Sequence, residues 1–301
     1  MRLNTKVKDK VKVFGLLLFS VATSFCSYAQ ENTDDDLDNL IDELFFTDKQ
    51  FVDELLESSL SYRFLYTSLS YNSNTFFSGR DSGVDQFNII PQVSYYHSSG
   101  FNASISGIYY QNFDPSWDFT SVSVGYFNTL GKKKNTVYNV GYTKFFYSDG
   151  YYVFTNSIDV SLGIRNSKRS LGTTINAAYL FGTDNSFQLV SNTFANINLK
   201  RNSKVAWRLR PNISFIIAKQ SITFQRFIRT PLGPRLVTFT DDVFDLLNTQ
   251  INLPISLTTN SWDFELGYSI NLPKALPNET DLNTTGFLSF SVGYMFDLQK
   301  K

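Results

Sequence analysis

The chain of 301 residues is poor in the side chains that build metal sites and cross-links, with one Cys, one His and two Met. A single Cys excludes a disulfide framework, and the Cys and His ligands of a structural zinc site are missing. Charged residues make up 18% of the chain, below the roughly 25% of ordinary soluble domains. With a formal net charge of zero, the whole chain has no basic balance suited to nucleic acid. We therefore expect no cofactor, no metal and no nucleic-acid partner.

The motifs of familiar enzymes are missing as well. The sequence contains no nucleophile elbow, phosphate-binding loop or metalloprotease signature. Its only His, His97, stands at the end of an expected strand beside a short turn, and the adjacent Ser98 would point to the opposite side of that strand. We expect His97 to be an interfacial residue, and we expect no catalytic residues.

The chain has no apolar run long enough to span a membrane as a helix. Its longest apolar run lies near the N-terminus. Five bases in the first twelve positions precede an apolar stretch over residues 13–25, and Ser27 and Ala29 supply the small residues of a cleavage site. This stretch is shorter than the about 20 residues that a spanning helix needs. We predict a signal peptide over residues 1–29, cleaved after Ala29. The alternatives are an uncleaved anchor and a lipoprotein carrying lipid on Cys26.

Residues 30–57 differ in composition from the rest of the chain. Between residues 31 and 57 there are eleven acids and one base, which gives a net charge of −10. Apolar residues recur there at the i, i+3, i+4, i+7 spacing of one helix face: Leu37, Leu40, Ile41 and Leu44. We predict a short helical segment in the periplasm or in the mouth of the following domain as a plug. The alternative is a solvated acidic linker.

What the chain has in abundance is aromatic residues, and from residue 58 onward they follow period two. Aromatics make up 16% of the chain. Apolar and polar residues alternate over residues 187–200, 205–217, 262–272 and 286–298. Because successive side chains of a strand face opposite sides, one face of each strand is apolar and aromatic and the other is polar or small. In the first strand both phases carry aromatics, so we expect a β-bulge there.

Turn residues divide this region at regular intervals. Short turns are expected at residues 97–100, 131–135, 166–169, 201–204 and 258–261, and breaks that are longer on average lie between them. The count is about twelve strands, an even number, as in bacterial single-chain barrels. Short turns are typically periplasmic in such barrels, so both ends of the strand region would lie in the periplasm with the acidic segment.

The pattern over residues 58–301 resembles the outer-membrane β-barrel proteins of Gram-negative bacteria, the porin-like class. Segments of about ten alternating residues separated by turns are typical of their strands. The alternating aromatics Phe290, Tyr294 and Phe296 are similar to their C-terminal insertion signal. The resemblance implies an all-β fold, an antiparallel up-and-down transmembrane β-barrel in the cell outer membrane, and it assigns no functional residue. The alternative is a secreted β-sandwich, which has shorter strands.

If the aromatic phase faces lipid, the polar phase lines the lumen, because a charge on the lipid face costs about 2–4 kcal/mol at the midplane. The pore-lining candidates are Asp159, Arg208, Arg210, Asp263 and Glu265. The two arginines share one strand, and the last two acids fall two strands further on. We interpret them as opposed basic and acidic walls of a diffusion pore. A closed interior held by salt bridges is the alternative.

Two further basic groups are candidates for contacts outside the lumen. The longest break, over residues 221–245, alternates around a Pro-Gly turn, so we predict a hairpin above the membrane or a loop folded into the mouth, with an ordinary exposed loop as the alternative. Its candidate residues are Arg226, Arg229 and Arg235. The short turns supply a periplasmic rim: Lys132, Lys133, Lys134, Lys168, Arg169, Arg201 and Lys204.

The sequence therefore favours a narrow pore for passive diffusion of small polar solutes. The alternative is a non-conducting structural or accessory subunit of an outer-membrane complex, which binds a protein partner through residues 31–57. Further partners implied by the class are outer-membrane lipid and lipopolysaccharide, and the barrel-assembly machinery during insertion. The acidic segment is also expected to dock on the basic rim or to enter the lumen.

Overall fold

The computed structural model describes residues 62–77, 80–81, 85–112, 114–131, 134–148, 154–202, 205–230, 233–259, 261–276 and 282–298, with the backbone alone at residues 77, 80–81, 118, 220–230 and 233–243. The predicted signal peptide and acidic segment lie outside these residues. In the part of the chain that the structure describes, no helix is long and apolar enough to cross a membrane.

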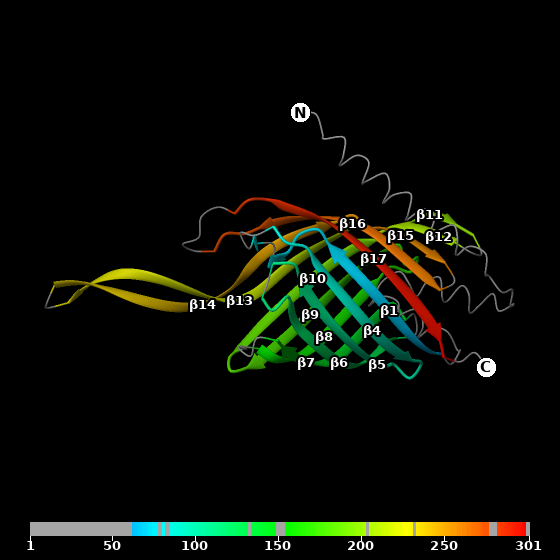
Figure 1. The fold of residues 1–301 in the computed structure, drawn as a ribbon, viewed down its shortest axis with the longest axis horizontal. Coiled ribbons are helices and arrows are strands. Elements are labelled where there is room, and N and C mark those ends of the chain that lie inside the picture. The colour runs from blue at the N-terminus through cyan, green and yellow to red at the C-terminus, as the bar shows by residue number, and fades with distance from the viewer. Residues whose placement is uncertain are drawn as a thin grey trace, which may run out of the picture. The chain divides into compact units, whose positions relative to one another are not determined.

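Almost all of the described residues belong to antiparallel strands (Figure 1). The strands are β1 (Arg63–Asn72), β2 (Phe76–Phe77), β3 (Arg80–Asp81), β4 (Asn88–His97), β5 (Phe101–Tyr110), β6 (Trp117–Leu130), β7 (Thr136–Tyr147), β8 (Phe154–Arg165), β9 (Leu171–Gly182), β10 (Asn185–Ala195), β11 (Ile197–Arg201), β12 (Val205–Leu209), β13 (Asn212–Thr230), β14 (Gly233–Asn252), β15 (Ile255–Thr259), β16 (Trp262–Pro273) and β17 (Thr285–Asp297). β2 and β3 pair only with each other.

The other fifteen strands form one closed wall. β10 with β11, β12 with β13, and β14 with β15 are each a single wall strand interrupted by one or two residues, so the wall has twelve strands. Pro211 and Pro254 lie in two of the interruptions, where a residue without an N–H cannot continue the ladder. β1 pairs with β4 on one side and with β17 on the other, which closes the barrel. The predicted all-β fold and strand number are confirmed.

The five short turns lie together at one end of the barrel, which we call the short-turn end. They connect β4 to β5, β6 to β7, β8 to β9, β11 to β12, and β15 to β16, all at predicted positions. The barrel also begins and ends there, because Arg63 pairs with His97 and Phe64 pairs with Asp297. Connections at the opposite end, the loop end, are longer on average, although β9 and β10 are joined by two residues.

The segment over residues 221–245 is a continuation of two strands. β13 and β14 remain paired from Asn212↔Asn252 to Thr230↔Gly233, while their outer neighbours stop at Gln188 and Pro273. The excess length forms a two-stranded ribbon that extends beyond the other strands (Figure 1, yellow). The predicted hairpin is therefore present, and the alternative of an ordinary loop is wrong.

The bulge expected in the first strand is absent. β1 pairs with β17 from Phe64 to Asn72 in continuous register, and its pairing with β4 is equally regular. Leu69 and Tyr71 face outward, whereas Tyr62 and Phe64 are buried on the inner side. Aromatics occur in both phases because β1 carries inward rings toward the short-turn end and the outward Tyr71 toward the loop end.

Candidate functional site

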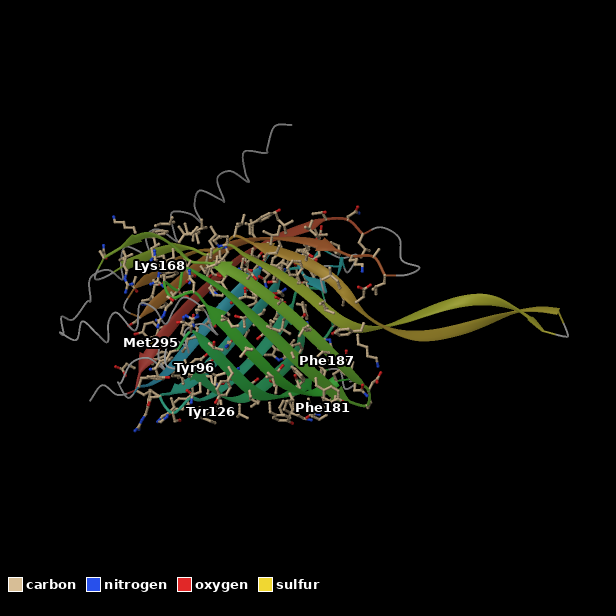
Figure 2. All side chains as sticks on the ribbon, turned by 180° about the vertical axis from the view of Figure 1, so that it is seen from behind. Tyr96, Tyr126, Lys168, Phe181, Phe187 and Met295 are labelled. Atoms are coloured by element: carbon tan, nitrogen blue, oxygen red, sulfur yellow. The ribbon has the colours of Figure 1, made fainter. Side chains whose placement is uncertain are left out.

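The register and the side-chain exposure together identify the inward phase of each strand. The outward side chains of β7 and β8 are exposed on the outside of the barrel, with Val140 at 46% and Val160 at 48% exposure. On the opposite face of the same strands, Val137 and Ser157 are buried. Figure 2 shows side chains on both faces, with Tyr126 and Phe187 labelled on the outward phase and Tyr96 and Met295 on the inward phase. Four of the five pore-lining candidates lie on the inward phase of their strands. The fifth, Arg210, directly follows the last residue of β12.

The arginines and the acids Asp263 and Glu265 lie on two wall strands that are separated by one strand, and not on opposed walls. Arg208 pairs with Ser256, and Ser256 pairs with Glu265, so the arginine and the acid share one row of the wall with a single strand between them. At a strand spacing of about 4.8 Å, their backbones lie about 10 Å apart. The interpretation of facing basic and acidic walls is therefore wrong, because two strands cover only a small arc of a wall of twelve.

Asp263 is the most enclosed of the acids, with 6% exposure. Its Oδ1 accepts a hydrogen bond from the Thr258 hydroxyl at 3.2 Å, and its Oδ2 accepts one from the Tyr66 hydroxyl at 3.5 Å. Tyr66 reaches Asp263 from β1 across β17, where its ring lies over Gly293. Replacing that glycine by a larger residue would displace the ring, so Gly293 is the position that makes this arrangement possible.

Asp159 lies apart from the other charges. It is on β8, which β9 and the β10–β11 strand separate from Arg208. Its Oδ1 accepts a hydrogen bond from the Ser157 hydroxyl at 3.0 Å. Its cross-strand neighbours are Gly141 and Ala178. Small residues on both sides leave this carboxylate facing the lumen.

Sequence reasoning missed a third inward arginine, Arg165, at the short-turn end of β8. It is buried with 8% exposure, and its side chain lies beside Gly172, which the Phe194 ring also covers. On the other side of Phe194, the Arg210 guanidinium lies over the ring at 4.3 Å from its centroid, within the range of a cation–π contact. The period-two pattern could have identified Arg165, because it continues the phase of Asp159 and Ser161.

Sequence reasoning placed Tyr96 on the lumen side but missed the other inward aromatic residues at the short-turn end. The rings of Tyr62 and Phe64 lie 5.8 Å apart, and those of Phe64 and Tyr96 stack at 5.2 Å. Phe127 and Met295 are buried on the same inner side. These side chains narrow the barrel at this end. The rule that aromatic residues face lipid is wrong for them.

The loop end carries a second inward aromatic group on β6 and β7, formed by Phe119, Phe145 and Tyr147. Its ring centroids lie 5.5–6.3 Å apart, and all three side chains are half-buried. On the same wall, the Ser106 and Ser121 hydroxyls lie 2.9 Å apart and are hydrogen bonded. This part of the lumen wall therefore combines rings with hydroxyl groups.

An amide network lines the inner face of β13, β14 and β16. Asn271 Oδ1 accepts hydrogen bonds from Asn248 Nδ2 and Gln250 Nε2, both at 3.0 Å. Deeper in the lumen, Asn252 Nδ2 donates to Asn212 Oδ1 at 2.7 Å, and the Ser269 hydroxyl donates to Asn252 Oδ1 at 2.6 Å. The network presents amide and hydroxyl groups without a charged member.

The basic loop and rim candidates can be placed only in part. The register sets Arg226 opposite Val237 and Arg235 opposite Ile228 in the β13–β14 ribbon, with Arg229 next to them, and their side chains lie outside the described residues. Of the rim candidates, the structure places Lys134, Lys168, Arg169 and Arg201 at the short-turn end, and Lys132, Lys133 and Lys204 are not among the described residues. Figure 2 labels Lys168 in its turn.

His97 has a local structural role in the turn after β4. Its Nδ1 accepts a hydrogen bond from the Ser99 backbone N–H at 3.0 Å and lies 2.9 Å from the Ser99 hydroxyl. Its ring lies 6.5 Å from that of Tyr95. His97 Nδ1 is thus hydrogen bonded within its own turn.

An ion pair at the loop end supports a prediction about pH. Lys274 Nζ donates to both carboxylate oxygens of Asp245 at 2.7 and 2.8 Å, and the Leu246 N–H donates to Oδ1. The hydrogen bond from Lys274, with that of Leu246, holds the pKa of Asp245 below its ordinary value. A lowered carboxyl pKa means that the pair contributes stability at neutral pH, which is lost only as the pH falls through this lowered pKa.

We expect the Asp245 carboxyl carbon to titrate in NMR spectra below the ordinary value of about 3.9. In Lys274→Gln the midpoint should rise toward that value, because the strongest hydrogen-bond donor to the charged form is lost. An unchanged midpoint in Lys274→Gln would show that the lysine does not set the titration.

No protein-family model matches the sequence, and no curated protein matches it. Among solved structures, the chain is similar to the KdgM porin (10% identity, TM-score 0.45, 77% of this chain and 99% of that chain). It is also similar to the NanC porin (14%, 0.44, 76% and 98%) and to an outer-membrane channel from Pseudomonas putida F1 (8%, 0.45, 80% and 98%).

These likenesses concern the fold alone, and the assignment rests on the chain's own geometry. A closed barrel satisfies its backbone hydrogen bonds internally, as a chain in lipid must. Its outward phase is apolar along successive strands, including Val122, Val140, Ile158 and Ile175. The chain is therefore a closed up-and-down β-barrel of twelve antiparallel strands whose outward face is apolar, as in a barrel that spans a membrane.

Proposed function

We propose that the barrel is a narrow pore for passive diffusion of small polar solutes across the outer membrane. Eight-stranded barrels are filled by side chains and barrels of sixteen or more strands leave a channel, so twelve strands are compatible with a narrow passage. The inward phase of the wall consists mostly of Ser, Thr, Asn and Gln, with charges confined to a few positions.

A single observation carries the proposal. The side-chain oxygens of Asn139, Asn176 and Asn192 are buried on the inward phase, and within the described residues none of them accepts a hydrogen bond. Buried polar atoms in proteins are nearly always satisfied, by protein or by ordered water. Three such acceptors on β7, β9 and β10 would be costly in a dry apolar interior, so they support a hydrated, polar lumen wall suited to small polar solutes.

The accessory-subunit function is the second candidate, and the aromatic group at the short-turn end favours it. Tyr62, Phe64 and Tyr96 narrow the interior at that end, as a non-conducting barrel would require. In this reading residues 31–57 bind a protein partner. Their net charge of −10 also suits docking on the basic rim, and apolar contacts would have to assist because salt screens charges beyond about 8 Å.

Reconstitution in planar bilayers distinguishes the two functions. We expect discrete ion conductance from the mature chain, and an increase when residues 31–57 are deleted if the segment acts as a plug. A heat-denatured sample of the same preparation controls for contaminating channels. Silence of both proteins in a folded state would contradict the pore and favour the accessory subunit. Lipid, lipopolysaccharide and the barrel-assembly machinery are the partners proposed for either function.

The proposed organisation of the chain is a signal peptide over residues 1–29, an acidic segment over residues 30–57 and the barrel from residue 58. The composition of the N-terminus supports export by a cleaved peptide. Intact-mass spectrometry of the protein from outer membranes should show a chain that begins at Gln30. A mass that includes residues 1–29 would favour the uncleaved anchor.

A further inference from the structure

A carboxylate lies at the middle of the inner wall, and within the described residues no Lys or Arg nitrogen forms an ion pair with it. We propose that this residue, Asp159, selects solutes by charge, and that it favours small cations over anions of the same size. Primary ammonium compounds are the organic members of this solute class. The inference names the solute class of the pore proposed above and rests on that function.

Asp159 lies midway along its strand. In β8, which runs from Phe154 to Arg165, it directly precedes Val160, whose exposed side chain faces outward. An ionisable side chain at this depth of a membrane protein is costly unless it meets water, and such residues mark the routes of ions and solutes. The carboxylate therefore requires a hydrated lumen beside it, and it places a negative charge halfway along that lumen.

The wall around Asp159 is built from small residues, which leave the carboxylate accessible from the lumen. Gly141 pairs with Asp159 on one side, and Gly125 pairs with Gly141 on the next strand, while Ala178 pairs with Asp159 on the other side. Among the described residues, a Cβ added to Gly141 would meet only the Val124 carbonyl oxygen, at 3.5 Å. Asp159 itself is only half-buried. A hydrated cation can therefore approach it.

The carboxylate retains acceptor capacity for a cationic solute. In the described part of the chain its side chain accepts one hydrogen bond, from the Ser157 hydroxyl to Oδ1 at 3.0 Å. An ionised carboxylate has about four lone-pair sites, so most of them remain open to the lumen. An ammonium group brings three donors and no acceptor, which suits this site, whereas a solute carboxylate brings acceptors alone and a charge of the same sign.

The other charges of the inner wall leave this one uncompensated. Among the described inward residues of β6 to β10, Arg165 is the only charged residue besides Asp159. It lies further along β8 by about 20 Å, at about 3.3 Å per residue, which exceeds two Debye lengths of about 8 Å. Two arginines and two acids on or next to β12 and β16 offset each other: Arg208, Arg210, Asp263 and Glu265. A solute that passes β8 therefore meets a single negative charge.

The test measures charge selectivity in planar bilayers, from the reversal potential of the mature chain in a KCl gradient. We expect the wild type to prefer K⁺ over Cl⁻, and Asp159→Asn to lower this permeability ratio about two- to fivefold, the effect of one unit charge at close range in water. Asp159→Glu keeps the charge and should keep the preference. Asp184→Asn is the matched control, because it removes a carboxylate from the exposed turn between β9 and β10, and it should leave the ratio unchanged.

A preference of the wild type for Cl⁻, an unchanged ratio in Asp159→Asn, or an equal fall in Asp184→Asn would overturn the selecting role of Asp159 and leave the pore intact.

A second measurement is independent of ion current. Putrescine, a small diamine, is added to the folded protein in detergent, and the NMR signal of the Asp159 carboxyl carbon is followed, with butanediol as the neutral control of equal length. The signal is assigned by its loss in Asp159→Asn, and we expect only the diamine to shift it. If none of the folded proteins conducts, the pore is overturned, and the diamine then decides the cation site: a shift supports it, and no shift overturns it.

Discussion

Val160→Arg is expected to destabilise the folded barrel by about 2–4 kcal/mol, the cost of a cationic side chain at the bilayer midplane. Val160 lies at the middle of β8, pairs with Val140 and Ala177, and faces outward. Its neighbour Ser161 pairs with Asn139 and Asn176 on the inward phase. Ser161→Arg should therefore cost less than about 1 kcal/mol, because the lumen hydrates the guanidinium.

The measurement is reversible unfolding in urea with the barrel in lipid vesicles, and the quantity compared is the free energy of unfolding. The two substitutions are adjacent and introduce the same side chain, so the strand propensity of the new arginine is the same in both. Equal losses of stability at both positions would mean that the outward face of β8 does not contact lipid while its inward face contacts water. This outcome would contradict the membrane-spanning assignment itself.

Gly293→Ala is expected to destabilise the barrel by about 1–3 kcal/mol, the usual cost of an extra carbon atom in a filled interior. A Cβ at this position would lie 2.7 Å from Cε2 of the Tyr66 ring. Moving the ring would also break its hydrogen bond to Asp263. Gly141→Ala is the matched control, because its Cβ would meet only the Val124 carbonyl oxygen, at an ordinary 3.5 Å.

A double-mutant cycle identifies the cause. If the clash with Tyr66 is responsible, Gly293→Ala should cost much less in a Tyr66→Ala background, so the two substitutions should be strongly non-additive. The same urea unfolding measurement applies to all four proteins. Additive losses would place the effect elsewhere, in the backbone of β17.

The strand count and the short turns could be predicted because both depend on local signals. Period-two alternation identifies a strand wherever it occurs, and Gly, Asn and Lys clusters mark its ends. The same signals predicted that Arg208 and Asp263 share the inward phase. Their separation by two wall strands was also predicted, and in a wall of twelve it spans only a small arc, so the interpretation as opposed walls did not follow from the strand count.

The inward aromatics show a different limit. Alternation separates two faces of a strand but does not say which face meets lipid when both carry rings. Phe64 and Leu65 are equally apolar, yet only Phe64 is buried on the inner side against Tyr96. This burial depends on a ring from the next wall strand, 32 residues further along the chain. Likewise, the pairing of the β13–β14 ribbon beyond its neighbours is a property of strand length and not of local pattern.

The seam between β1 and β17 has a consequence for how the barrel is made. Every other neighbouring pair in the wall is consecutive in the chain, but at the seam the Thr67 hydroxyl donates to the Tyr294 carbonyl oxygen over a separation of 227 residues. Hairpins can form as soon as their two strands exist, whereas a contact of such long range is slow and comes after the entropy of the whole loop has been lost. Until β17 arrives, the sheet has two open edges able to pair with other chains. β17 is thus the last wall strand to be made, and the barrel cannot close until β17 is available to pair with β1.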